Sequence, residues 1–150
     1  MVFTKLGKML GLVAIAAAFA GCQQKGGTNN TDDMSGGVTP WGCSNTVYFD
    51  FDKSDIKAES QDCLVKGGAY LKANASAKLV IEGHADERGT PEYNMALGER
   101  RSNAVISVLM ANGGMKGQAE AVSYGEERPA VEGHDESAWS KNRRAVITGK

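Results

Sequence analysis

The sequence predicts an α+β domain in which a mixed four-stranded sheet carries its helices on one face. Two observations predict this class: stretches with helical spacing of apolar residues alternate with short runs typical of strands, and Gly or Pro marks several boundaries. The predicted order is β-α-β-α-β-β. Because the chain has 150 residues, of which 41% are hydrophobic, we expect one folded domain with tails.

The first half of the folded region is expected to contain a strand, a helix and a second strand. Residues 47–51 (VYFDF) alternate apolar and polar side chains, which is the period of a half-buried strand. Residues 57–74 place Leu64 and Leu71 at helical spacing. Residues 78–83 (KLVIEG) are a β-branched run that ends in glycine, so they predict a buried strand.

The second half begins with a well-marked helix. Threonine and proline at residues 90–91 predict an N-cap followed by the first helical position, and the helix should run to Ala111, where Asn-Gly-Gly follows. Residues 119–124 and 144–148 predict two strands, with an irregular, briefly helical segment between them. Gly98 should cost this helix up to ~1 kcal/mol relative to alanine unless close backbone packing requires it.

The N-terminus is typical of an exported lipoprotein. Residues 1–8 carry two lysines and no acid, and the thirteen residues 9–21 are all apolar or glycine. Because a transmembrane helix needs about 20 apolar residues, the stretch 1–21 predicts a signal peptide instead. Cys22 follows small residues in a context, FAGC, that resembles the bacterial lipobox. This implies a lipid on Cys22; the alternative is an ordinary signal peptide beside a coincidental cysteine.

Residues 22–40 then predict the lipidated cysteine and a flexible tether, and residues 41–150 the folded domain. The tether contains few apolar side chains, so it cannot bury enough surface to order itself. Two or three acyl chains anchor a protein stably. Gln23 stands where an aspartate would mark inner-membrane retention in enterobacterial lipoproteins. That resemblance implies an outer-membrane protein whose domain faces the periplasm.

Composition and motifs argue against several classes of function. Seventeen basic and eighteen acidic residues give a net charge of −1, which disfavours a nucleic-acid partner. No phosphate loop and no Gly-x-Ser-x-Gly motif occurs, so no enzyme and no cofactor are predicted. His84 and His134 lack the spacing of metal-binding motifs, so we expect no metal site.

Arg101 and Asp86 are the candidate functional pair. At 100° per residue, Arg101 falls on the apolar stripe of the second helix, where an isolated guanidinium would cost several kcal/mol and needs an anionic partner. Asp86, in the preceding loop, is the best candidate. The two side chains either form an ion pair that braces the loop or flank a cleft. In such a cleft the acid would bind an ammonium and the arginine a carboxylate.

Four segments, VYFDFDK, IEGHADERGTPEYNMALGERR, VSYGEERPAVEGHDE and SKNRRAV, resemble the peptidoglycan-associated lipoproteins, whose C-terminal module is the OmpA-like domain. The resemblance spans about residues 43–147. It implies an OmpA-like fold and non-covalent binding of peptidoglycan through the diaminopimelate of its stem peptide. The residues that match binding positions of that family are Asp86, Arg101, Asn94, Leu97, Phe51, Asp52, Thr90 and Arg143.

The same resemblance implies association with TolB and other Tol proteins, and a role in envelope integrity and cell division. Three alternatives remain open from the sequence. The chain could be a wall-binding lipoprotein outside the Tol system, a purely structural lipoprotein in which Asp86 and Arg101 brace a loop, or a peptidoglycan-modifying hydrolase. The last would need a nucleophile or a metal-bound water, and no such constellation is present.

Cys43 and Cys63 are left once Cys22 is assigned to the lipid. An exported chain meets an oxidising compartment, and a disulfide closing this twenty-residue loop would add about 3 kcal/mol. The sequence therefore favours a disulfide between them. The alternative is two separate thiols, with Cys63 buried on the first helix.

Overall fold

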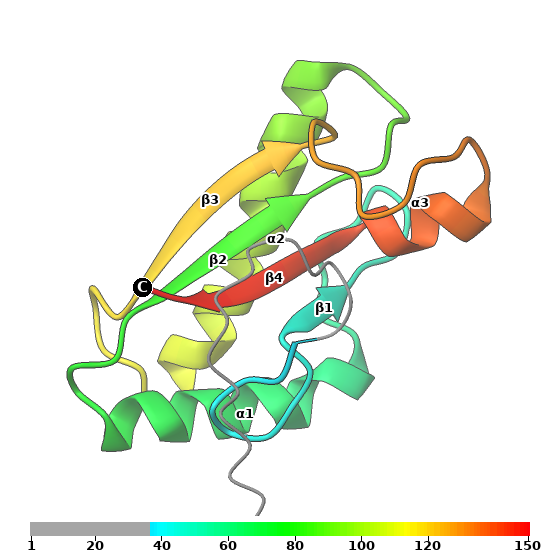
Figure 1. Cartoon of the computed structure of the whole chain (residues 1–150). Helices are drawn as coiled ribbons and strands as arrows, with labels where there is room; N and C mark the ends of the chain where they lie inside the picture. Colours follow the sequence, from blue (N-terminus) through cyan, green and yellow to red (C-terminus); the bar gives the residue numbers. More distant parts are fainter. Residues whose placement is uncertain (1–36) are drawn as a thin grey trace, which may run out of the picture. The chain divides into compact units, whose positions relative to one another are not determined.

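The computed structural model describes residues 37–150, so the predicted signal peptide, Cys22 and most of the tether lie outside the described residues. The elements, drawn in Figure 1, are β1 (Thr46–Tyr48), α1 (Ala58–Ala73), β2 (Leu79–His84), α2 (Pro91–Ala111), β3 (Ala119–Gly125), α3 (Glu136–Asn142) and β4 (Arg144–Gly149). The strands lie in the order β1-β4-β2-β3, with β2 and β3 parallel and the other neighbours antiparallel. The predicted α+β class and mixed four-stranded sheet are confirmed.

Helices α1 and α2 lie against one face of the sheet, and α3 leads into β4 at the end of the sheet (Figure 1). Between the sheet and these two helices lies the apolar core, which consists of Val47, Phe49, Leu64, Leu71, Leu79, Ile81, Val105, Leu109, Ala145 and Ile147. None of the helices between residues 37 and 150 combines the length and apolar character that a bilayer crossing requires. The core therefore fixes the sheet and the two helices against each other, and these elements support the loops at their ends.

The first strand is shorter than predicted. The alternating pattern predicts a strand over residues 47–51, but β1 ends at Tyr48, which pairs with Arg144, the first residue of β4. Beyond Tyr48, the Phe49 N–H still donates to the Arg143 carbonyl at 3.0 Å, but the ladder with β4 is over and the chain then turns at Asp52, which has a φ of 55°. Phe49 nevertheless stays buried. The prediction was wrong because strand length depends on the neighbouring strand as well as on alternation.

The helix boundaries follow their local signals. Thr90 caps α2 by accepting a hydrogen bond from the backbone N–H of Tyr93 at 3.2 Å, and Pro91 occupies the first turn, as predicted. The segment expected to be briefly helical forms α3, whose N-cap Asp135 accepts from the backbone N–H of Ser137 at 3.0 Å. These caps satisfy N–H groups that a helix start leaves without intrahelical partners.

The folded region begins before Trp41. Thr39 is buried, and its backbone N–H donates to the carbonyl of Cys43 at 2.7 Å. Trp41 then packs on α1, with its ring centroid 5.4 Å from that of Tyr70. The last residues assigned to the tether, 37–40, are thus part of the fold.

Both Cys43 and Cys63 are free thiols in the structure, so the disulfide favoured by the sequence is not formed there. Cys63 projects from α1 toward the N-terminal segment, with its Sγ 4.0 Å from the carbonyl oxygen of Ser44. Burial, together with the neighbouring Cys43 side chain, raises the pKa of the Cys63 thiol to about 11. Since the thiolate is the reactive form, this thiol is a weak nucleophile at neutral pH.

Gly98 marks a close approach between α2 and the sheet. A methyl group at position 98 would come within 2.8 Å of the carbonyl oxygen of Gly83 and would also overlap Ser123 Oγ. Gly83, on β2, faces Gly98 directly, and a methyl group there would overlap the Gly98 carbonyl and reach Ser102 Oγ at 2.5 Å. The expected helix cost of Gly98 is therefore offset by backbone packing that no other residue permits.

We expect Gly83→Ala to lower the free energy of unfolding by about 1–3 kcal/mol or more, because the added methyl group forces α2 away from β2. Denaturant unfolding measures this loss. Gly149→Ala is the matched control, because a methyl group there would meet no atom within 4 Å. Equal stability of the two variants would show that α2 can shift without cost.

Candidate functional site

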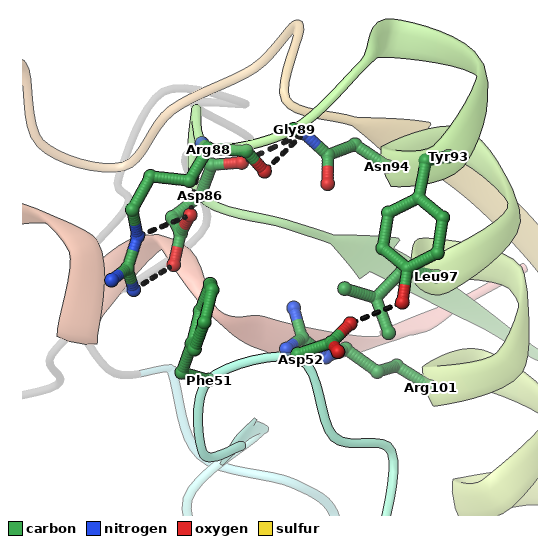
Figure 2. Close-up of a pocket in the computed structure, with 9 residues that line it drawn as sticks. All are labelled: Phe51, Asp52, Asp86, Arg88, Gly89, Tyr93, Asn94, Leu97 and Arg101. Carbon is green, nitrogen blue, oxygen red and sulfur yellow. Dashed lines mark hydrogen bonds and ion pairs between the residues drawn. The ribbon is translucent and has the colours of Figure 1, made fainter.

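The candidate site is a cavity of about 180 Å³ at the start of α2, shown in Figure 2. It is formed by the β1–α1 loop, the β2–α2 loop and one face of α2. This volume is well above the roughly 15 Å³ that one water molecule needs. The residues that line it are Phe51, Asp52, Asp86, Arg88, Gly89, Tyr93, Asn94, Leu97 and Arg101.

Asp86 is held at the wall of this cavity by arginines. Two residues after the end of β2, its carboxylate accepts from Arg88 Nε at 3.1 Å and Nη2 at 2.8 Å, and from the Arg88 backbone N–H at 3.0 Å. Arg143 Nη1 lies 3.5 Å from the same carboxylate. Burial alone would raise the pKa of Asp86, but the hydrogen bonds from Arg88 outweigh it and hold the pKa below its usual value. The carboxylate therefore remains an anion at neutral pH.

Arg101 is fully buried on α2 and faces the sheet, as the helical wheel predicts. Of the two arrangements that the sequence left open, the ion pair with Asp86 is not formed. Arg101 donates instead to three backbone carbonyls, those of Lys53 at 2.9 Å, His84 at 2.7 Å and Asp50 at 3.1 Å. Carbonyl oxygens of the β1–α1 loop and of the last residue of β2 thus supply the partners that the sequence interpretation assigned to an acid.

The charge of Arg101 survives this burial. Burial lowers the pKa of the guanidinium to about 10, and the nearby charge of Asp86 opposes that fall. Arg101 is therefore still a cation at neutral pH. Of its five N–H groups, three hydrogen bonds to carbonyls leave two without a protein partner among residues 37–150. A buried acid and a buried base thus line one cavity, and no hydrogen bond or ion pair joins them.

Asn94 forms the part of the cavity wall next to Asp86. Its Nδ2 donates to the carbonyl oxygens of Asp86 and Arg88, each at 3.1 Å, and to Glu126 Oε2 at 2.5 Å. These bonds orient the amide so that its oxygen points toward the cavity (Figure 2). The side chain therefore offers a hydrogen-bond acceptor to the cavity that the Asp86 carboxylate also lines.

The mouth and the apolar parts of the cavity come from the other predicted residues. Asp52 accepts a hydrogen bond from the hydroxyl of Tyr93, which links the β1–α1 loop to α2 (Figure 2). Phe51 and Leu97 supply apolar surface, and Phe51 is 54% exposed. Six of the eight predicted site residues thus meet at one cavity.

Two predicted residues do not line the cavity. Thr90 caps α2 and so positions the helix. Arg143 lies behind Asp86, where it also donates to the Phe49 carbonyl at 3.0 Å and to Glu136 at 2.5 Å. Sequence reasoning also missed the cavity residues Arg88, Gly89 and Tyr93. The signal for Arg88 was its place two residues after Asp86, close enough to fold back on that carboxylate.

His84 ends β2 and is buried behind the site. Its ring lies 5.4 Å from that of Tyr124, and its Nδ1 has no hydrogen-bond partner among residues 37–150. Burial, followed by the charges of Arg144 and Arg128, lowers the pKa of His84 to about 3. His134 is instead exposed and lies 2.8 Å from Glu87. Residues 37–150 contain no cluster of His, Cys, Asp and Glu suited to a metal ion.

Acid should therefore destabilise the fold through His84. In the unfolded chain the histidine binds a proton below about pH 6.5, whereas the folded chain resists protonation until about pH 3, so stability falls between these values. We expect His84→Phe to remove a loss of about 2 kcal/mol between neutral pH and pH 5. Denaturant unfolding at several pH values measures this. His134→Gln should keep the acid loss, because it leaves His84 in place.

Comparison with known proteins links this site to a family. The OmpA family matches residues 48–143 of the chain. The peptidoglycan-associated lipoprotein of Pasteurella multocida is 48% identical over 146 residues, covering 95% of this chain and 97% of the relative. That of Pseudomonas aeruginosa is 41% identical over 167 residues, covering 98% and 99%.

Solved structures agree with the sequence relatives. The crystal structure of the peptidoglycan-associated lipoprotein from Burkholderia pseudomallei matches with a TM-score of 0.69 and 43% identity, covering 71% of this chain and 90% of that chain. The C-terminal domain of Helicobacter pylori MotB, at 17% identity, matches in fold alone with a TM-score of 0.64, covering 76% and 85%. The family match, the full-length relatives and the shared fold together assign this chain to the OmpA family, among the peptidoglycan-associated lipoproteins.

Proposed function

We propose that the chain binds peptidoglycan non-covalently and holds the free amino-acid end of diaminopimelate in the cavity at the start of α2. One observation carries this proposal. Asp86 and Arg101 keep opposite charges on one cavity of about 180 Å³, and neither neutralises the other. The end group of diaminopimelate carries an ammonium and a carboxylate on one carbon, so it complements such a pair.

Each part of the end group has a partner of matching chemistry. The ammonium, a donor only, would bind the Asp86 carboxylate and the Asn94 amide oxygen. The carboxylate would accept from the two N–H groups of Arg101 that the backbone carbonyls leave available. Phe51 and Leu97 would cover the methylene groups of the diaminopimelate side chain. Binding requires no covalent step, so the proposed function includes no catalysis.

The lipid anchor would complete the link between membrane and wall. We propose that Cys22 is acylated and holds the protein in the outer membrane, with the domain facing the periplasm. Its relatives are named lipoproteins, which supports this assignment. Anchoring confines the domain beside a repeating polymer, so each single contact can be weak. The anchor and the cavity together would tie the outer membrane to the cell wall.

A role in the Tol–Pal system is the finer part of the proposal. Resemblance to the peptidoglycan-associated lipoproteins implies association with TolB and other Tol proteins, and through them support of envelope integrity and cell division. A pull-down of TolB with the purified protein tests this partner. Wall binding without TolB capture would leave a wall-binding lipoprotein outside the Tol system.

Co-sedimentation with purified cell wall tests the binding proposal. The protein should pellet with diaminopimelate-containing wall, and free diaminopimelate should release it in a concentration-dependent way. Wall with lysine at the same position of its stem peptide is the matched control, because its side chain ends in an ammonium with no carboxylate beside it. Equal binding to both walls would contradict the role of Arg101, and binding to neither would contradict the proposed function.

A further inference from the structure

The guanidinium of Arg88 contacts two aromatic rings. Its central carbon is 3.8 Å from the centroid of the Phe51 ring and 4.0 Å from that of Trp139, so both distances fall within the range of cation–π contacts. The edge of the same guanidinium binds Asp86 through Nε and Nη2. Two aromatic rings and one carboxylate therefore contact this group.

Trp139 holds its place independently of Arg88. It belongs to α3, and its indole Nε1–H donates to Glu87 Oε1 at 2.9 Å. Phe51, the other ring in contact with Arg88, lies in a loop and is 54% exposed. Trp139 is thus the better fixed of the two rings, because a hydrogen bond and a helix both restrain it.

The same face of α3 also reaches the second arginine near Asp86. Glu136, three residues before Trp139 and hence on the same side of the helix, accepts from Arg143 at 2.5 Å and 3.2 Å. Arg143 in turn lies 3.5 Å from the Asp86 carboxylate. One short helix, which contributes no residue to the cavity lining, therefore contacts both arginines that hold the acid of the site.

We propose that α3 is a brace for the binding site and that Trp139 is a positioning residue for Asp86. Trp139 fixes the plane of the Arg88 guanidinium, and Arg88 fixes the direction in which the Asp86 carboxylate presents its remaining lone pairs to the cavity. Without the indole, the guanidinium can rotate and take the carboxylate with it. This inference rests on the proposed binding of the diaminopimelate end group, and it assigns to α3 a part in that binding without contact to the ligand.

Two substitutions of Trp139 distinguish the effect of aromatic stacking on Arg88 from the effect of filling space. Trp139→Leu keeps an apolar side chain without an aromatic face, and we expect wall affinity to fall about tenfold. Trp139→Phe keeps the aromatic face and loses only the hydrogen bond to Glu87, so it should retain most of the affinity. Lys141→Ala is the control on the same helix, because Lys141 is exposed, and it should bind as the unchanged protein does. Co-sedimentation with diaminopimelate-containing wall measures all of these affinities.

A second measurement tests the contact between Trp139 and Arg88 in the absence of ligand. Protons near the face of an aromatic ring are shifted upfield, so the Arg88 Nε–H signal should lie further upfield in the unchanged protein and in Trp139→Phe than in Trp139→Leu, which keeps the hydrogen bond to Asp86 but lacks the ring. If Trp139→Leu binds wall with unchanged affinity while the parent protein binds, the positioning role is wrong and the proposed function stands. If the parent protein itself does not bind wall, the proposed function is wrong and this role falls with it.

Discussion

Asp86→Asn should lower the affinity for diaminopimelate-containing wall by about 30-fold or more, which is the effect of removing one partner of a buried charge pair. The amide has nearly the shape of the carboxylate but carries no charge, so it cannot balance an ammonium. The site around it would then contain Arg88, Arg101 and Arg143, which repel the ammonium of the end group. A binding isotherm on purified wall measures the loss.

The matched control for this variant is Asp55→Asn, which removes the same charge from an exposed position in the β1–α1 loop. It should bind wall as the unchanged protein does, because Asp55 does not line the cavity. Thermal unfolding of both variants checks the fold. If folded Asp86→Asn binds normally, the ammonium is held elsewhere and the assignment of the acid is wrong.

Arg101→Met should lower the free energy of unfolding by about 3–5 kcal/mol, an effect comparable to breaking a buried ion pair. The guanidinium is fully buried and supplies hydrogen bonds to the carbonyls of Asp50, Lys53 and His84. Methionine fills most of the space but donates nothing, so three carbonyls lose their partner. Because Asp50 and Lys53 belong to the loop of Phe51 and Asp52, the cavity should also lose its shape. Denaturant unfolding measures the first effect.

Arg100→Met is the matched control, since it is the neighbouring residue of the same type on the same helix. Arg100 is exposed and contacts the ring of Tyr93 only at 5.4 Å, so we expect its replacement to change stability by less than about 0.5 kcal/mol. Similar stabilities for the two variants would mean that the loop carbonyls find water or other donors when Arg101 is removed. In that case Arg101 would serve ligand binding more than the fold.

Local signals predicted most of the fold. The cap and proline at Thr90 and Pro91 are sufficient to mark the start of α2, because they satisfy N–H groups within the same turn. The β-branched run of residues 78–83 likewise corresponds to β2, displaced by one residue. The end of β1 was missed because it depends on where β4 begins, more than ninety residues later in the chain.

The site residues also divide into those that local signals predicted and those that depend on the tertiary structure. Helical spacing placed Asn94, Leu97 and Arg101 on one face of α2, and in the structure all three line the cavity. The partner of Arg101 could not be predicted in this way, because any carbonyl that the fold brings near can satisfy a guanidinium. The part played by Trp139 was also hidden, because α3 approaches Arg88 only through the connection between β3 and β4.

For this protein, residue order alone determined the α+β class, the helix starts and the presence of an acid and a base on facing elements, since each depends on neighbours within a few turns of chain. Only the tertiary structure decided which groups form hydrogen bonds and ion pairs with them. Arg88 and Arg143 hold Asp86, and backbone carbonyls hold Arg101, so both charges remain directed at one cavity. The physical reason is that buried charges take the nearest partner in space, and distance in space is a property of the packed chain.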